Sequence, residues 1–477
     1  MIRRTLTVVF AVSLVAAPSA FGQQYVAGSD GAGDPFFPKA GNGGYDARHY
    51  DLTLDYDQPD NFLAGNATIA ATATENLRRF NLDLRNFFKV AGVSVNGSPA
   101  KYVLRDVQEL RIIPSAPLDA GDDFTVDVDY SGRPRPIKDP DKSFEGFIPT
   151  DDGAFVVNEP QGSPGWFPVN DIPWDKATYE FTVTVPAGHT VMGNGELVSH
   201  TTGAGEETWR WREDDPMSSY LTTITNGPFD TSFYSTDFGL PMYDAVDPDT
   251  ALSTRLDPDP DPDPDVAWER LGRQGEIIEF FSDLYGSYPF TTGGGIVDWA
   301  PSVGYALESQ TRANYHRVPS ASTVVHEIAH QWFGNAVTLD SWPDIWLNEG
   351  FATFSEWIYT ERHGGQSAAD AFDELYAVPE SDPFFEELWF PAPAALEHPR
   401  QLFHTPVYDR GAMTLQALRE EVGDDGFFEI MRRWYAENKY GNASTGDFIA
   451  LAEEVSGSDL EDFFQAWLYE EGRPETW

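Results

Sequence analysis

The sequence predicts a multi-domain α+β protein in which an antiparallel β-rich domain precedes a mainly helical domain. The chain has 477 residues, which is more than one hydrophobic core usually organises. Hydrophobic residues recur with period two in the first half and at helical spacing in the second half. They make up 41% of the chain, and aromatic residues make up 14%, which is enough for sizeable cores and unlike a disordered protein.

The β-rich half extends from about residue 45 to residue 229. Apolar and polar side chains alternate in two clear stretches, which contain Phe124, Val126, Val128 and Tyr130, and Phe181, Val183 and Val185. Such alternation places one set of side chains on the buried face of a strand. Asn96-Gly97 stands between apolar segments and is a preferred dipeptide of tight hairpin turns. An antiparallel β domain is therefore predicted here.

The helical half begins after about residue 240. Trp268, Leu271, Ile278 and Phe281 recur at helical spacing, and Gly286 beyond them is typical of a helix stop.

Further helices are predicted over residues 320–333, 345–363 and 412–422. Ser458 followed by Glu461 has the pattern of a capping box, which predicts a last helix that contains Trp467.

The first residues have the features of an export signal. Arg3 and Arg4 provide a positive start, residues 6–17 form a short apolar run, and small residues precede Gln23. The run is short for a membrane span, and an uncleaved anchor is the alternative.

We therefore predict a signal peptide over residues 1–22, a β domain over 23–230 and a helical domain over 231–477. We expect a secreted or periplasmic protein with no membrane segment after cleavage, because no later stretch is apolar enough to span a bilayer.

The chain is strongly acidic and has no cysteine. Lys and Arg total 31 against 77 Asp and Glu, which gives a formal net charge of −46. Such a surface repels phosphates, so no nucleic-acid partner is expected. The acidity fits a heavily hydrated surface or adaptation to high salt, in which ions screen the repulsion between carboxylates. The lack of cysteine excludes a thiol nucleophile and cysteine-bound zinc. The oligomeric state stays open.

An Asp-Pro repeat covers residues 257–265. Alternating prolines remove backbone donors and stiffen the chain, so a solvated surface loop is predicted. Calcium binding by its five Asp residues is the alternative, but the prolines oppose the tight wrap that six or more oxygen ligands require.

The chemistry of the chain centres on an H-E-x-x-H motif, in which His326 and His330 enclose Glu327. Residues four apart lie on one face of a helix, so both imidazoles can bind one zinc ion. Glu327 lies beside the first ligand and can act on a water molecule without binding the metal. The alternative is an ordinary amphipathic helix with two surface histidines.

A third ligand is expected because a catalytic zinc usually has three protein ligands and one open position. Glu349 follows in the segment Asp344-Ile345-Trp346-Leu347-Asn348-Glu349-Gly350. Gly334 and Pro343 interrupt the chain between the two predicted helices, so the chain can turn back and direct Glu349 at the same metal.

These residues closely resemble the M1 family of zinc aminopeptidases, which belongs to the gluzincins. The resemblance rests on the run HEIAHQWFGNAVTLDSWPDIWLNEGFA, in which eighteen residues separate the second His from the Glu. It extends to Trp166-Phe167-Pro168 and to the closing FFQAWL segment at residues 463–468. It implies one zinc ion, a thermolysin-like catalytic domain, and a short form of the family that lacks the C-terminal helical domain.

Three more site residues are implied by this resemblance. Tyr408 lies in a Tyr-x-Arg-Gly segment, whose tyrosine stabilises the oxyanion in the family. Glu308 corresponds to the glutamate of the family's G-x-M-E-N segment, which binds the free amino group of the substrate. Tyr305 stands there in place of glycine, and Ser309 replaces asparagine. Glu159 falls where the family has a second amine-binding residue.

The resemblance implies a secreted zinc aminopeptidase that acts on peptides with a free N-terminus. A zinc endopeptidase of the same fold is one alternative, but it would gain nothing from Glu308. A non-catalytic peptide-binding module is the other, although such a module would usually have lost a zinc ligand or Glu327.

Overall fold

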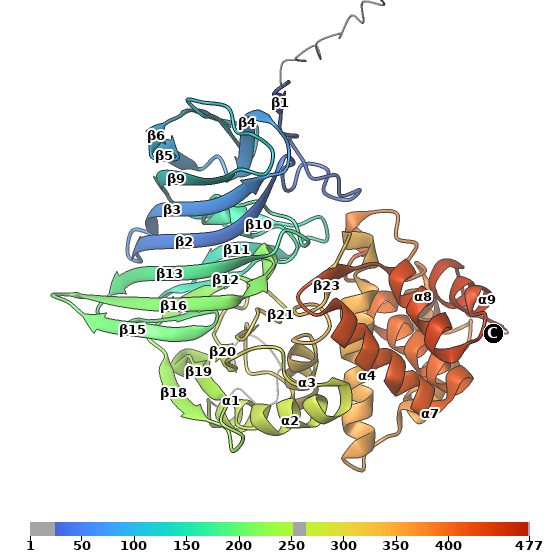
Figure 1. Ribbon diagram of the computed structural model, residues 1–477. Helices are drawn as coiled ribbons and strands as arrows, with labels where there is room; N and C mark the ends of the chain where they lie inside the picture. Colours follow the sequence, from blue (N-terminus) through green and yellow to red (C-terminus); the bar gives the residue numbers. More distant parts are fainter. Residues whose placement is uncertain (1–23, 251–263, 476–477) are drawn as a thin grey trace, which may run out of the picture.

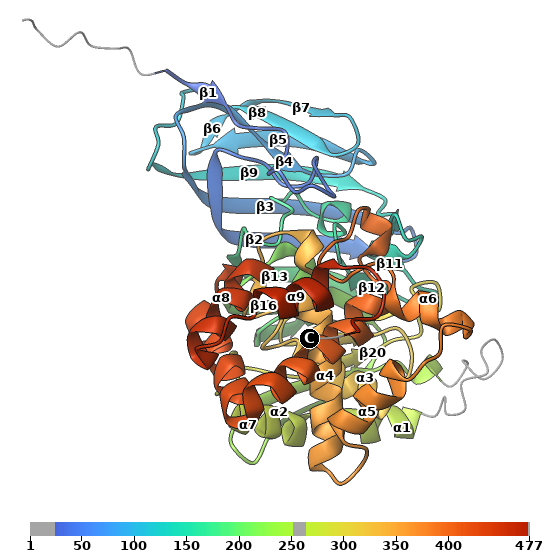
Figure 2. The same cartoon turned by 90° about the vertical axis from the view of Figure 1, so that its right-hand side faces the viewer.

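The computed structural model describes residues 24–250 and 264–475. The predicted signal peptide lies outside these residues, and so does most of the Asp-Pro repeat. The chain forms a β-rich part, drawn in blue to green in Figure 1, and a helical part drawn in yellow to red. Figure 2 shows the same division from the side, with the helices below the first strands. The predicted β-then-helical fold class is confirmed.

The largest sheet of the β-rich part has eight strands in the order β15-β16-β13-β2-β3-β9-β5-β6. Its strands are β2 (Tyr45–Asp57), β3 (Phe62–Ala73), β5 (Phe88–Val95), β6 (Ser98–Pro99), β9 (Asp123–Gly132), β13 (Ala177–Pro186), β15 (Glu196–Thr202) and β16 (Glu206–Met217). The predicted alternation is confirmed, since Phe124 in β9 and Phe181 in β13 both have buried side chains. Asn96 and Gly97 have positive φ angles of 51° and 70° and form the predicted hairpin turn between β5 and β6.

One pairing in this sheet departs from the predicted antiparallel arrangement. β13 runs parallel to β2, with Thr178 opposite His49, while the other neighbours in the sheet are antiparallel. Parallel neighbours require a long crossover connection, and the chain between β2 and β13 is long enough to provide one. Period-two alternation reports which face is buried and carries no information on strand direction.

Two smaller sheets complete the β-rich part. One has the order β1-β4-β8-β7, and the other has the order β10-β11-β12-β17-β14. Their strands are β1 (Val26–Ala27), β4 (Leu77–Asp83), β7 (Lys101–Arg105), β8 (Glu109–Ile113), β10 (Ile137–Lys138), β11 (Phe144–Pro149), β12 (Ala154–Val157), β14 (Thr190–Gly193) and β17 (Ile224–Gly227). Strand β12 leads directly into Glu159 and so into the site described below.

The second half also contains a sheet, with the order β18-β19-β20-β22-β21. Its strands are β18 (Asp230–Ser235), β19 (Pro241–Val246), β20 (Gly295–Val297), β21 (Ala306–Leu307) and β22 (Ala313–Tyr315). β19, β20 and β22 are parallel, so their carboxyl ends meet at one edge of the sheet. A two-stranded parallel sheet joins β23 (Thr338–Leu339) to β24 (Asn442–Ala443).

Nine α-helices lie within the described residues. They are α1 (Pro264–Leu271), α2 (Gln274–Tyr285), α3 (Ala321–Ala329), α4 (Trp346–Arg362), α5 (Ala368–Tyr376), α6 (Pro383–Trp389), α7 (Gly411–Asn438), α8 (Thr445–Ser456) and α9 (Glu461–Phe464). In the parts of the chain that the structure describes, no helix is both long and apolar enough to cross a membrane.

The predicted helices occur at the expected positions, but several differ from the prediction in length. α4 has nearly the predicted bounds, and α2 ends before Gly286, which has the positive φ angle of 119° expected at a helix stop. The periodic stretch before Gly286 forms two helices, because the chain turns between α1 and α2. α7 continues well beyond Val422, through a kink at Gly423 whose φ angle is 75°. The end of the Asp-Pro repeat belongs to a helix, since Pro264 is the first residue of α1.

The predicted capping box at Ser458 is wrong. Helix α9 begins at Glu461 after Leu460, whose side chain makes no capping hydrogen bond. The backbone N–H of Leu460 instead donates to the Glu453 side chain, and that of Glu461 donates to Asp459. The N–H of Ser458, which a capping box would have bound to the Glu461 side chain, donates to the Ser456 hydroxyl at 3.2 Å. The helical chain continues beyond α9 as a π-helix over Gln465–Tyr469.

Hydrogen bonds that are at least partly buried join the β-rich part to the helical part. The Lys176 ammonium donates to the carbonyls of Asn335 and Ala336, at 3.1 Å each. The Tyr220 hydroxyl donates to the carbonyl of Gly334 at 3.1 Å. All three acceptors follow the H-E-x-x-H motif directly, so the β-rich part is anchored to the segment that carries the predicted zinc ligands.

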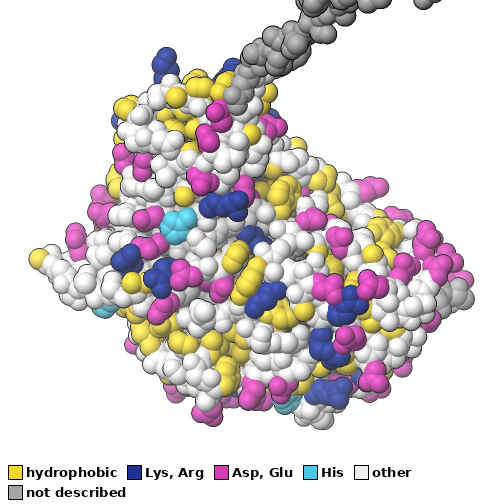
Figure 3. Space-filling model, viewed as in Figure 1, with side chains coloured by type: hydrophobic (Ala, Val, Ile, Leu, Met, Phe, Trp, Pro, Cys, Tyr) yellow, Lys and Arg dark blue, Asp and Glu magenta, His cyan; other side chains and the backbone are white. Residues whose placement is uncertain are grey.

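The acidic side chains are spread over both parts of the molecule. On the face shown in Figure 3, Asp and Glu occur on the β-rich part and in greater number on the helical part, among fewer Lys and Arg. This distribution agrees with the excess of 77 acidic over 31 basic residues.

Candidate metal centre and active site

The two histidines of the motif lie on one face of α3. The Ser320 hydroxyl caps this helix by accepting a hydrogen bond from the Thr323 N–H at 3.0 Å. His330 follows the last residue of α3 but keeps helical backbone angles, with φ −57° and ψ −24°. The two imidazoles therefore lie one turn apart and meet edge to face, with ring centroids 4.7 Å from each other.

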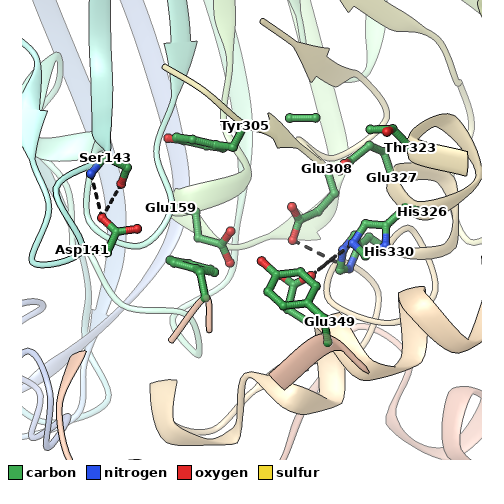
Figure 4. Close-up of a pocket in the computed structure, with 13 residues that line it drawn as sticks. Asp141, Ser143, Glu159, Tyr305, Glu308, Thr323, His326, Glu327, His330 and Glu349 are labelled. Atoms are coloured by element: carbon green, nitrogen blue, oxygen red, sulfur yellow. Dashed lines mark hydrogen bonds and ion pairs between the residues drawn. The ribbon is translucent and has the colours of Figure 1, made fainter. Parts of the chain in front are cut away.

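Glu349 comes to these histidines from the first turn of α4. Its Oε2 atom lies 3.1 Å from Nε2 of His326 and 3.4 Å from Nε2 of His330. Its side chain is buried, with 3% of the residue exposed. The structure thus brings the three predicted zinc ligands together, as the close-up in Figure 4 shows.

The other ring nitrogen of each histidine is engaged away from the centre. Nδ1 of His326 lies 2.7 Å from a carboxylate oxygen of Glu356, and Nδ1 of His330 lies 3.0 Å from the carbonyl oxygen of Phe333. Such contacts fix the ring orientation and leave each Nε2 available to bind a metal when the ring is neutral. Glu356 was not identified from the sequence. Its spacing of seven residues after Glu349, which is two turns on one face of α4, is the signal that could have found it.

This arrangement fits a zinc ion. Two bonds of about 2.0–2.1 Å at a tetrahedral angle place their ligand atoms about 3.3 Å apart, close to the separations of 3.1 and 3.4 Å. Two imidazole nitrogens and one carboxylate oxygen are also a ligand set that zinc accepts. Burial raises the pKa of Glu349, but the nearby histidines outweigh it and lower that pKa to about 2, so the carboxylate is ionised.

Glu327 lies beside this group without belonging to it. Its carboxylate comes within 4.8 Å of ligand atoms of His330 and Glu308. Only 5% of the residue is exposed, and this burial raises its pKa to about 8 against the opposing effect of the two histidines. A carboxylate with a raised pKa next to a metal centre is suited to accept and return a proton near neutral pH.

Tyr408 lies across the site from α3. It belongs to a π-helix over Pro406–Arg410, and its ring faces that of His326 with centroids 6.1 Å apart. Arg410 is fully buried and donates hydrogen bonds to four backbone carbonyls, those of Trp389, Ala466, Trp467 and Glu470. Burial raises the pKa of Tyr408 well above its usual range, so its hydroxyl stays protonated and can donate.

Glu308 and Glu159 form a pair of buried carboxylates on the third side of the site. Glu308 follows β21, Glu159 follows β12, and both come within 4.8 Å of Glu349. They are 2% and 6% exposed. One oxygen of each, Oε1, accepts no hydrogen bond from the described residues. Burial raises the pKa of both groups, and in Glu159 the negative charge of Glu308 raises it further.

The carboxylates and histidines surround a cavity of about 240 Å³. Tyr305, Phe403 and Ala306 form its apolar walls, and Asp141 and Ser143 lie at the end away from the histidines (Figure 4). The Tyr305 hydroxyl donates to the carbonyl of Phe144 at 3.0 Å, which holds this ring at the wall. None of the described residues that line the cavity is Lys or Arg.

All seven residues predicted from the sequence therefore line one cavity. The roles assigned to them stay predictions. Three features of the site were not predicted from the sequence: Glu356, the position of Tyr305 in the wall, and Asp141, which comes from a part of the chain without a motif.

Two family models match the chain. Residues 46–221 match the Peptidase M1 N-terminal domain, and residues 303–467 match the Peptidase family M1 domain.

Similar proteins include aminopeptidases. An Aminopeptidase N from Streptomyces lividans is 29% identical over 364 residues, and Aminopeptidase M1-D from Oryza sativa subsp. japonica is 29% identical over 333 residues. These matches cover 69% and 65% of the chain but only 40% and 36% of the two relatives.

A solved M1 zinc metallopeptidase from Deinococcus radiodurans has the same fold. It superposes with a TM-score of 0.81 at 27% identity, and the match covers 93% of this chain and 99% of that one. A mutant of that protein has been solved with a Tyr-Ser-Ala substrate bound.

Proposed function

Because the chain belongs to the M1 family of peptidases, we propose that it is a zinc aminopeptidase that removes the N-terminal residue of peptides. Zinc is its cofactor, and His326, His330 and Glu349 would hold it. When bound, zinc acts as a Lewis acid toward the scissile carbonyl and makes water a stronger nucleophile at neutral pH.

Glu327 is the general base of this proposal. Its carboxylate lies next to the ligand group but is not part of it, so it is free to take a proton from the attacking water. The same carboxyl group then delivers the proton to the leaving amine. The raised pKa of about 8 supports both steps, because a group that titrates near the working pH can accept and donate.

Tyr408 stabilises the negative charge that develops on the carbonyl oxygen. Its phenol is a protonated donor across the site from His326, on a π-helix that Arg410 holds in place. A donor directed at charge that exists only in the transition state lowers the barrier selectively.

The observation that carries the proposal is the pair Glu308 and Glu159. Both carboxylates are nine-tenths buried, and each has an oxygen that accepts no hydrogen bond from the described residues. The Oε1 atom of Glu308 lies 3.9 Å from Nδ1 of His330, too far for a hydrogen bond, and the α-ammonium group of a substrate would give both buried carboxylates a close partner. The pair lies beside Glu349. When it binds the substrate's ammonium group, the first peptide bond of that substrate therefore lies next to the predicted zinc ligands.

The two rival functions fit this pair less well. In an endopeptidase, uncharged backbone of the substrate would occupy this position. It would bring no positive charge to offset the repulsion between the two buried carboxylates. A non-catalytic binding module would have no use for Glu327, which lies in place beside a complete ligand group. Export is also part of the proposal, supported by the apolar segment of residues 6–17 behind Arg3 and Arg4.

The test compares substrates that differ only at the amino group. The zinc-loaded protein should release the first residue from aminoacyl-coumarin substrates and short peptides, and their N-acetylated forms should be nearly inert. The variant Glu308→Gln should lower kcat/KM on the free-amine substrate by about 30-fold or more, since it removes one charge of a buried pair. Glu374→Gln, on the exposed side of α5, is the matched control and should change nothing. Internal cleavage, or equal rates on acetylated peptide, would show an endopeptidase instead.

A further inference from the structure

The active-site cavity continues past the proposed amine site. Asp141 and Ser143 line its far end, and Figure 4 shows Glu159 and Tyr305 between that end and the histidines. A substrate whose ammonium group lies at Glu159 and whose first carbonyl lies at the zinc ligands has one large substituent left on its α-carbon, which is the first side chain. The end of the cavity at Asp141 is the space beside the amine site that this side chain can enter.

The hairpin between β10 and β11 holds Asp141 in place. Its strands pair Lys138 with Phe144, and the backbone N–H of Asp139 donates to the carbonyl of Ser143 at 3.0 Å. The Asp141 carboxylate accepts from the backbone N–H and the hydroxyl of Ser143, at 2.8 and 2.6 Å, and both bonds reach the same oxygen, Oδ1. The other oxygen, Oδ2, accepts no hydrogen bond from the described residues, so it is free to bind a group in the cavity.

Negative charge dominates the cavity. None of its described lining residues is Lys or Arg, whereas it is lined by the carboxylates of Asp141, Glu159, Glu308, Glu327 and Glu349. The neighbour of Asp141 in the sequence, Lys142, is exposed and lines a separate hollow of the surface. The zinc ion and the substrate's ammonium group would bring positive charge to the other four carboxylates. At its end of the cavity, Asp141 therefore lacks a cationic partner among the described residues that line it.

The wall of the cavity beside Asp141 is aromatic. The Tyr305 hydroxyl donates to the carbonyl of Phe144 at 3.0 Å, so this ring is tied to the hairpin that carries Asp141. The carbonyl of Tyr305 accepts from Nδ1 of His316 at 2.7 Å, which fixes its backbone as well. Phe403 adds a second aromatic ring to the lining. A long side chain that runs along these rings buries its methylene groups and presents its polar end to Asp141.

We propose that this end of the cavity selects peptides whose first residue is arginine, and less strongly lysine, and that Asp141 binds the cationic end of that side chain. This inference rests on the aminopeptidase function proposed above. Arginine fits best because its planar guanidinium group stacks on aromatic rings and donates several hydrogen bonds to a carboxylate. An apolar first residue would cover Asp141 without giving it a partner, and an acidic one would add repulsion.

The experiment compares aminoacyl-coumarin substrates that differ only in the first residue, with the full-length, zinc-loaded protein. Citrulline has nearly the shape of arginine but no charge, so this pair isolates the contribution of the charge. The arginyl substrate should have a kcat/KM about tenfold or more above the citrullyl one, as expected for a hydrogen bond to a charged group. It should also exceed the leucyl substrate, and the glutamyl substrate should be the slowest.

The outcomes separate this inference from the function on which it rests. If alanyl and leucyl substrates are cleaved but the arginyl substrate is no faster than the citrullyl or leucyl one, the inference is wrong and the aminopeptidase stands. If no substrate with a free amino group is cleaved, both are wrong. The comparison needs no variant, so it decides the matter even if a change at Asp141 prevents folding.

Two variants test the role of Asp141 itself. Asp141→Asn keeps an oxygen for the bonds from Ser143 but removes the charge, so the ratio of arginyl to citrullyl kcat/KM should fall to about one. Asp373→Asn, an exposed change on α5, should keep the ratio of the wild type. Calorimetry on the zinc-loaded Glu327→Gln protein gives a readout without turnover. Arginyl-alanine should bind about tenfold more tightly than citrullyl-alanine, and adding Asp141→Asn should remove the difference. A preference for arginine that survives Asp141→Asn would overturn the proposal.

Discussion

The backbones of Gly350 and Gly411 touch, so closely that a β-carbon on Gly350 would lie 2.8 Å from the Cα atom of Gly411. Gly350 follows Glu349, the predicted zinc ligand, in α4, and Gly411 follows the segment that carries Tyr408. No other residue type fits at this crossing, because the neighbouring atoms belong to the backbone and cannot swing away. The contact therefore sets the distance between a metal ligand and the predicted oxyanion donor.

A substitution at this crossing should lower activity, although neither glycine lines the active-site cavity. Gly350→Ala is expected to lower kcat/KM at least tenfold and to lower Tm, because α4 and the start of α7 must separate to admit the methyl group. Activity and thermal unfolding measure the two effects.

The control is Gly426→Ala in α7, where the nearest atom to the new carbon is 3.5 Å away on Val422. This change should raise stability by about 0.5–1 kcal/mol, as Gly-to-Ala changes do within helices. Equal effects of the two changes would contradict the role of the crossing.

The zinc content of two variants should distinguish the predicted ligand Glu349 from the predicted general base Glu327. Glu349→Ala removes one of three protein ligands and should leave far less than one zinc per chain by elemental analysis. Glu327→Gln keeps the ligand group intact and should retain zinc, yet lose about 10²–10⁴-fold in kcat. Full zinc in Glu349→Ala would contradict the assignment of that residue.

Glu356 is expected to act as a positioning residue through His326. Its carboxylate lies 2.7 Å from Nδ1 of that ring. Glu356→Gln keeps an acceptor of the same shape but loses the charge, and should weaken zinc binding about 10–100-fold in a chelator competition. Because excess zinc refills the site, activity should recover when zinc is added. Activity that stays low in excess zinc would show a different role.

Stability should fall as pH rises through the range in which buried acids titrate. Burial raises the pKa of Asp171 to about 7, and its side chain accepts from the Ser219 hydroxyl at 2.7 Å. The unfolded chain loses this proton near pH 4, so the folded state holds the extra proton between about pH 4 and 7. The contribution to stability is full below pH 4 and is lost as pH rises through 7.

Urea unfolding at several pH values measures this loss. Asp171→Asn cannot titrate, and it should flatten the decline between about pH 4 and 7. The exposed change Asp373→Asn should leave the decline as it is in the wild type. An unchanged slope in Asp171→Asn would mean that other groups carry the effect.

Salt should stabilise the protein. The net charge of −46 is spread over both parts of the chain, and screening shortens from about 10 Å at 0.1 M to about 3 Å at 1 M salt. Repulsion between surface carboxylates is relieved accordingly, so Tm should rise with sodium chloride into the molar range. A Tm that stays flat or falls would leave the acidity as a matter of solubility alone.

The sequence by itself determined the local features of this protein. Alternation in β9 and β13, the turn at Asn96-Gly97 and the helix that carries His326 and His330 depend on contacts within a few residues, which a periodic pattern reports directly. The resemblance to a known family supplied Tyr408, Glu308 and Glu159, which no local pattern would have singled out.

Only the tertiary structure decided the relations between distant segments. The parallel pairing of β2 with β13 and the bonds from Lys176 to the carbonyls of Asn335 and Ala336 join residues whose contact leaves no periodic trace in the chain. The crossing of Gly350 and Gly411 belongs with them. Neither glycine is required by its own helix. A side chain is excluded at each position only because the other helix packs against it there.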